Sequence, residues 1–155
     1  MTQPTVESLV QLLHDCESFA KQMLVTSGEF YPFGAFVNPK GQIEALGAHM
    51  GTEHPNSQEL YRFLHEAIAQ MAREGKLIAY GIASNVNIPQ QFEPAFPDGI
   101  RVHVEAPEYS RYIYTPYRLL SHQRIRKFLG FVPQIEYAEQ ITVDVEPNVF
   151  QPLVG

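Results

Sequence analysis

The stretch Gly28-Glu29-Phe30-Tyr31-Pro32-Phe33-Gly34-Ala35-Phe36-Val37 joins the end of a helix directly to an aromatic-rich strand. A glycine can adopt the left-handed conformation that ends helices, whereas aromatic and β-branched residues favour strands. The proline within the stretch withholds a backbone donor, which suits the start or the edge of a sheet. We expect these aromatic side chains to pack in a core, with ligand binding as their alternative use.

The segments on either side of this stretch follow regular patterns. An apolar residue recurs every three or four positions from Val6 to Leu24, which predicts an amphipathic helix that Thr5 caps and Gly28 ends. Downstream, Asn38-Pro39-Lys40-Gly41 has the residues of a tight turn. The strand should therefore turn into a hairpin whose return strand covers residues 42–47.

A second helix is predicted after a loop rich in glycine and histidine. Asn56 followed three residues later by Glu59 forms a capping box, and Gly75 ends the pattern. Its expected buried face consists of Leu60, Phe63, Leu64, Ala67, Ile68 and Met71.

From residue 77 onward the pattern changes from helical period to strand alternation. Strands are predicted over residues 77–88, 99–106, 110–115 and 140–145, while residues 121–129 fit a short helix or an irregular strand. The second of these strands alternates most clearly. It should place Ile100, Val102 and Val104 on a buried face and Arg101, His103 and Glu105 on a solvated one.

These elements predict an α+β fold in one domain over residues 1–155, with the order α-β-β-α-β-β-β and then a tail. Short connections favour antiparallel pairing, so we expect an antiparallel sheet of five or six strands. Placing both helices on one face of the sheet would bury every apolar stripe and leave the other face free for contacts. This order is similar to the profilin-like and roadblock-type layout.

Length and composition limit the classes of protein. The 155 residues suit one domain, and no apolar run approaches the roughly 18 residues that span a bilayer. The first residues lack the features of a secretion signal, so we expect a cytoplasmic protein without membrane contact. Cys16 is the only cysteine and lies on the apolar side of the first helix, which predicts a core residue. No motif indicates a cofactor.

Two sets of histidines are candidates for chemistry. His103 and Glu105 lie on one strand face and could transfer protons near neutral pH, although a solvated face also needs polar residues. His49, Glu53 and His54 fall in the glycine- and histidine-rich loop, where they could hold a divalent metal. Their spacing matches no established metal motif, so a polar surface loop is expected and no metal site is predicted.

Tyrosines and arginines alternate in the segment that follows. Such residues are enriched at protein interfaces, so we predict a binding surface for a protein partner or a second copy of this chain. The proposed surface consists of Arg111, Tyr112, Tyr114, Tyr117 and Arg118. Single-stranded nucleic acid is an alternative, but the net charge of −6 argues against it. The acidic tail, which includes Glu136 and Asp144, could instead fold back onto these basic residues.

A resemblance rests on the Gly28–Gly34 segment after a helix, the glycine hairpin and the run Gly99-Ile-Arg-Val-His-Val-Glu105. Together they resemble a group of small bacterial proteins of no known activity, over roughly residues 10–120. The resemblance therefore implies no catalytic residues.

The sequence favours a non-catalytic protein-interaction domain, either adaptor-like or immunity-like. The alternative is a small-ligand-binding protein or a hydrolase-type enzyme that uses His103 and Glu105.

Overall fold

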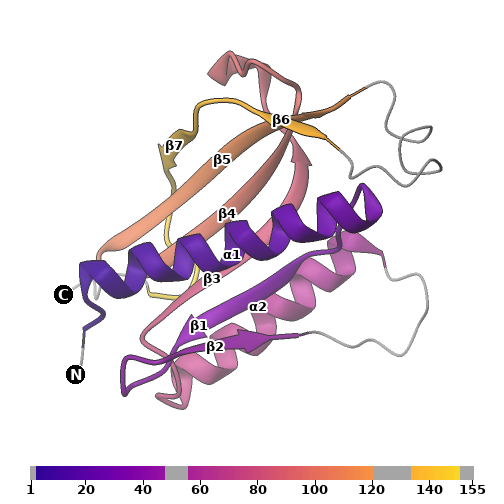
Figure 1. The fold of residues 1–155 in the computed structure, drawn as a ribbon. Coiled ribbons are helices and arrows are strands. Elements are labelled where there is room, and N and C mark those ends of the chain that lie inside the picture. The colour runs from indigo at the N-terminus through magenta and orange to yellow at the C-terminus, as the bar shows by residue number, and fades with distance from the viewer. Residues whose placement is uncertain (1–2, 48–55, 121–133, 151–155) are drawn as a thin grey trace.

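The computed structural model describes residues 3–47, 56–120 and 134–150 (Figure 1). In chain order their elements are α1 (Val6–Ser27), β1 (Phe33–Val37), β2 (Ile43–Leu46), α2 (Ser57–Arg73), β3 (Ala79–Asn87), the 3-10 helix η1 (Gln90–Phe92), β4 (Asp98–Ala106), β5 (Tyr109–Leu119), β6 (Ile135–Tyr137) and β7 (Ile141–Asp144). The predicted α+β class and the order α-β-β-α-β-β-β are confirmed. The segment at 121–129, with its two alternatives, lies outside the described residues.

All strand pairs within the described residues are antiparallel, in the order β2-β1-β3-β4-β5-β6. β7 also pairs with β5, so that β6 and β7 follow the same edge of this 11-residue strand. The sheet therefore has seven strands, one more than the largest number expected. β6 was missed because its three residues are too few to show an alternating pattern.

The helix ends have the predicted caps. Thr5 Oγ1 accepts a hydrogen bond from the Ser8 N–H at 3.0 Å, and Gly28 ends α1 with φ +76°. At α2, Asn56 Oδ1 accepts from the N–H groups of Gln58 and Glu59. The side-chain caps at Thr5 and Asn56 satisfy backbone donors that have no partner within the helix, so each helix begins where its local sequence dictates.

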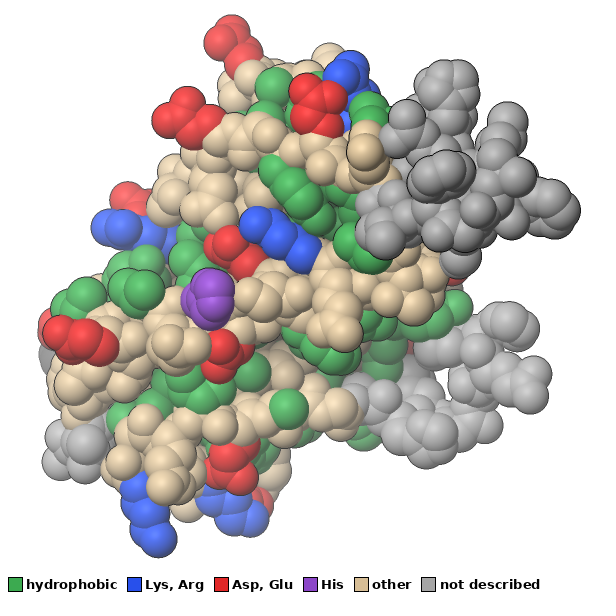
Figure 2. Space-filling view, in the orientation of Figure 1, with side chains coloured by type: hydrophobic (Ala, Val, Ile, Leu, Met, Phe, Trp, Pro, Cys, Tyr) green, Lys and Arg blue, Asp and Glu red, His purple; other side chains and the backbone are tan. Residues whose placement is uncertain are grey.

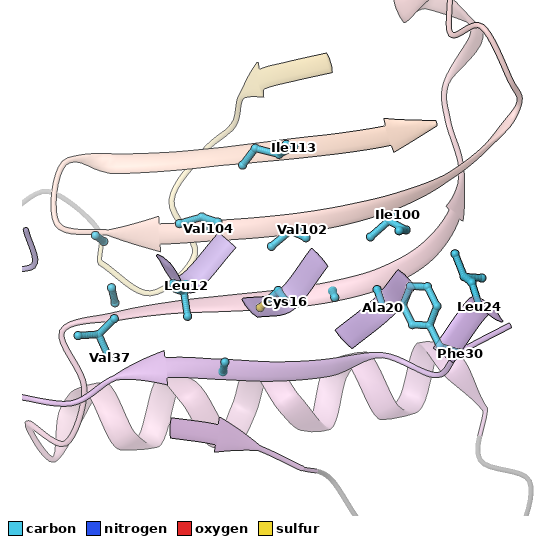
Figure 3. Close-up of a cluster of buried hydrophobic side chains, with 14 of the residues drawn as sticks. Leu12, Cys16, Ala20, Leu24, Phe30, Val37, Ile100, Val102, Val104 and Ile113 are labelled. Carbon is cyan, nitrogen blue, oxygen red and sulfur yellow. The ribbon is translucent and has the colours of Figure 1, made fainter. Parts of the chain in front are cut away.

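One face of the sheet packs against α1. Figure 3 shows the α1 side chains Leu12, Cys16, Ala20 and Leu24 facing Ile100, Val102 and Val104 of β4. The approach is close, since a Cβ added to Gly81 of β3 would lie 3.2 Å from Cys16 Sγ. The predicted buried face of β4 and the core position of Cys16 are both confirmed.

The other face packs against α2, so the expectation that both helices share one face is wrong. Leu64 and Ile68 of α2 contact Phe36, Tyr80 and Ile82, whose neighbours along β1 and β3 point towards α1. Figure 1 shows α1 in front of the sheet and α2 behind it. The physical reason is that β1 and β3 are apolar on both faces and each face needs cover. The expectation that one sheet face stays free for contacts is therefore wrong for β1 and β3, because α1 covers one of their faces and α2 covers the other.

Charges on the α1 side of the molecule are mixed. Figure 2 shows acidic and basic side chains interspersed there among apolar ones, with no gathering of one sign. Among the described residues, no helix is both long enough and apolar enough to cross a membrane.

Candidate functional site

A polar layer lies on the α2 side of the central strands. Residues directly opposite each other in an antiparallel pair point to the same face, so the register aligns side chains in rows across β3, β4 and β5. The three rows are Ser84–Arg101–Tyr114, Ile82–His103–Tyr112 and Tyr80–Glu105–Ser110. Tyr61 and His65 of α2 contact this layer from above, with ring contacts to Tyr80, Arg101 and His103.

Glu105 is fully buried and holds the C-terminal end of the described chain. Its carboxylate accepts hydrogen bonds from the N–H groups of Asn148, Val149 and Phe150 at 3.0, 2.9 and 2.6 Å. The Tyr80 hydroxyl donates a further short bond, and burial together with this bond raises the pKa of Tyr80. We call residues 148–150 the C-terminal strap. A carboxylate that receives several N–H bonds is well satisfied, so Glu105 has a structural role.

His103 is 1% exposed and lies next to Glu105. Its Nε2 is 3.0 Å from Ser110 Oγ and 3.9 Å from Glu105 Oε1, while Nδ1 has no hydrogen-bond partner among the described residues. Burial lowers the pKa of His103 to about 4, so the ring is neutral at pH 7.

Serine, histidine and glutamate are also the residue types of a hydrolytic triad. In such a triad the serine and the acid contact opposite ring nitrogens, because the acid must orient the histidine for proton transfer. Here Ser110 and Glu105 both approach Nε2 of His103. The catalytic role of His103 and Glu105 stays a prediction, and this geometry gives it no support.

Arg101 is the unusual charge of the layer. Its guanidinium lies over two rings, 5.3 Å from the centroid of Tyr61 and 4.4 Å from that of Tyr112. It forms no ion pair with an acidic side chain among residues 3–47, 56–120 and 134–150, and its buried Nε has no hydrogen-bond partner there. A partly buried cation without a counter-charge is costly, so this position suits a bound anion.

A cleft of about 440 Å³ opens beside Arg101. It lies between the first turn of α2, the segment before β1 and the second half of β3. Its lining is Phe30, Pro32, Ser57, Gln58, Tyr61, Ser84, Asn85, Val86, Asn87 and Arg101. Arg101 is the one charged residue in this set, and the positive end of the α2 dipole adds to its field. Ser84 is 4% exposed, and its hydroxyl has no hydrogen-bond partner among the described residues.

The structure does not bring the five predicted binding residues together. Tyr112 and Tyr114 lie on the α2 face in the polar layer, opposite His103 and Arg101. Tyr117 belongs to the core under α1, and its hydroxyl donates to Asn85 at 2.7 Å.

The two arginines of the predicted surface are paired with the tail. Arg111 Nε donates to Asp144 at 2.8 Å, and Arg118 pairs with Glu136. The expectation that the acidic tail folds back is therefore confirmed at both positions. The loop with His49, Glu53 and His54 lies outside the described residues. Among the residues that are described, no group of three ligating side chains could hold a metal.

Sequence reasoning missed the cleft. Arg101, His103 and Glu105 do share one strand face, but the prediction that this face is solvated is wrong, because α2 and the C-terminal strap cover it and leave His103 1% and Glu105 0% exposed. Nothing in the alternation distinguished Arg101 from its neighbours. Tyr61 and His65 are four residues apart on α2 and lie next to its apolar stripe. This spacing could have indicated that polar side chains of the helix also face the sheet.

Comparisons of the chain with protein-family models, with curated proteins and with solved structures each found no significant match.

Proposed function

We propose that this protein binds a small anionic molecule in the cleft beside Arg101. The observation that carries the proposal is the partly buried Arg101 side chain, which has no acidic partner among the described residues and is the one charged residue among those described that line the cleft. A bound anion would supply the missing counter-charge at a site where water screens it poorly. The affinity of such a ligand should therefore depend strongly on Arg101.

The size and lining of the cleft support a small-molecule site. Its volume of about 440 Å³ falls within the range of roughly 300–1,000 Å³ that is usual for small-molecule pockets. The lining contains both hydroxyl or amide side chains and apolar ones, which is the mixture that orients a ligand while burying its body.

Binding is better supported than turnover. Among the described residues that line the cleft there is no histidine, cysteine, lysine or carboxylate, so these residues offer no conventional general base. His103 and Glu105 lie in the neighbouring rows and do not line the cleft. Binding of a protein partner stays a prediction. The structure gives it less support than the anion site, because the residues expected to contact the partner are divided between two faces of the sheet.

The test is a calorimetric titration of the wild type, Arg101→Gln and Arg111→Gln with a panel of anions that includes sulfate, phosphate and organic carboxylates. We expect at least one anion to bind the wild type and to bind Arg101→Gln at least tenfold more weakly. Arg111→Gln removes an arginine on the opposite face and should leave the affinity unchanged. Equal affinity of the wild type and Arg101→Gln, or no binding by any anion, would overturn the proposal.

A further inference from the structure

We infer that the ligand of the Arg101 cleft is a carboxylic acid with an apolar body, and not a phosphate ester. This inference rests on the proposed function, because it specifies the chemistry of the anion that the cleft receives. Three properties of the cleft carry it: the number of charges, the free hydrogen-bonding groups and the apolar wall.

The charge of the site matches one negative charge. Arg101 is the single cation among the ten described residues that line the cleft. A phosphate monoester carries roughly −1.5 to −2 at pH 7, and it would keep excess charge after pairing with one guanidinium. The chain has a net charge of −6, which adds repulsion against a dianion. A carboxylate is neutralised fully by one arginine.

The free donors of the site match a planar acceptor. A guanidinium presents its N–H groups in a plane, and two parallel bonds from this plane fit the two oxygens of a carboxylate. Tyr61 and Tyr112 contact the guanidinium through their rings, and Tyr61 and Tyr114 also interact with Arg101 by side-chain hydrogen bonds, while its Nε–H has no partner among the described residues. Ser84 lies directly across from Arg101 in the register, and its buried hydroxyl has no hydrogen-bond partner within the described part of the chain. Arg101 and Ser84 can therefore both donate to one carboxylate group.

The remainder of the cleft suits an apolar body. Phe30, Pro32 and Val86 provide an apolar wall, and Phe30 is itself anchored in the core at 6% exposure. A rigid wall loses little entropy when it contacts a ligand, so apolar surface buried against it should add to the affinity of the ligand. A carboxylate with an aromatic or branched body would use both parts of the cleft.

Four matched probes separate these properties in the full chain. Phenylacetate has the carboxylate and the apolar body, phenyl phosphate replaces the carboxylate, phenylacetamide removes the charge and acetate removes the body. By calorimetry we expect phenylacetate to bind at least tenfold more tightly than each of the other three. Arg101→Lys keeps the charge but loses the planar pair of donors, so it should bind phenylacetate at least tenfold more weakly than the wild type does.

The outcomes distinguish this inference from the proposed function. Tighter binding of phenyl phosphate than of phenylacetate, lost in Arg101→Gln, would overturn the carboxylate and keep the anion site. Acetate binding as tightly as phenylacetate would overturn the apolar body alone. Binding of phenylacetamide as tight as that of phenylacetate, or affinities unchanged in Arg101→Gln, would overturn both. The probe series on the wild type needs no variant to fold, and circular dichroism checks the fold of the variants.

Discussion

The guanidinium of Arg101 lies 4.4 Å from the ring centroid of Tyr112, although the register places Tyr114 directly opposite Arg101. The contact is thus diagonal across β4 and β5, which long side chains can span. It directs the guanidinium along the polar layer towards the residue that stands opposite His103. Tyr112 is therefore a positioning residue for the cation of the proposed site.

Replacing Tyr112 by leucine should weaken anion binding. A cation–π contact is worth about 1 kcal/mol when partly shielded from water, so Tyr112→Leu should lower the affinity about fivefold. The matched control is Tyr109→Leu, which removes a ring 4.9 Å from the Arg111 guanidinium on the same strand. Tyr109 packs against the α1 core, so its loss should leave the affinity unchanged. Equal losses in both variants, measured by calorimetry, would contradict the role of Tyr112.

Removing the Glu105 carboxylate should destabilise the fold. Glu105→Ala leaves the N–H groups of residues 148–150 and the Tyr80 hydroxyl without their acceptor. The free energy of unfolding in urea should fall by about 3 kcal/mol or more. Glu105→Gln keeps the shape and one acceptor oxygen, so it should lose less. Glu139→Gln, at an exposed position, serves as the control; a Glu105→Ala variant as stable as this control would rule out the strap interaction.

The stability of the protein should decrease in acid because of His103. Burial lowers its pKa to about 4 in the folded state, whereas the ordinary value is 6.5. The unfolded chain therefore binds more protons between these values, and stability falls as the pH drops from about 6.5 to about 4. For His103 alone the loss amounts to about 3 kcal/mol.

His103→Gln removes this titration. As the pH falls from about 6.5 to about 4, the unfolding free energy of the wild type should decrease by about 3 kcal/mol more than that of His103→Gln. His14→Gln, on the exposed side of α1, should follow the wild-type profile. Parallel profiles for the wild type and His103→Gln would show that His103 titrates normally in the folded state.

Cys16 should resist thiol reagents while the protein is folded. Burial raises the pKa of its thiol to about 12, so the reactive thiolate is about a thousandfold scarcer at pH 8 than for an ordinary cysteine. Reaction with an aromatic disulfide, followed by absorbance, should appear only as urea unfolds the protein. Ser18→Cys places a thiol on the exposed side of the same helix and should react at once. Rapid reaction of native Cys16 would mean that the contact between α1 and the sheet opens frequently.

Local features of the fold could be predicted, because their causes lie within a few residues. The caps at Thr5 and Asn56 and the turn at residues 38–41 each depend on side chains and backbone close in sequence. The faces of the sheet could have been assigned better. Phe36 and Val37 are consecutive and both buried, and such a run indicates a strand covered on both sides.

The site was less accessible to sequence reasoning. Arg111 and Tyr112 were assigned to one surface, although neighbours along a strand point to opposite faces. Alternation correctly grouped Arg101 with Glu105. What covers them could not be inferred, because α2 and residues 148–150 reach β4 through contacts distant in sequence, and no local pattern encodes such contacts.

The strap has a further consequence during synthesis of the protein. Glu105 is translated 43 residues before Asn148, the first of the amides that it binds. At about 5–20 residues per second, a growing chain carries this carboxylate without those amides for about 2 to 9 seconds. The Glu105 carboxylate therefore gains its backbone donors late in translation, and products that stop before residue 148 would lack them and should be cleaved by proteases more readily than the full chain.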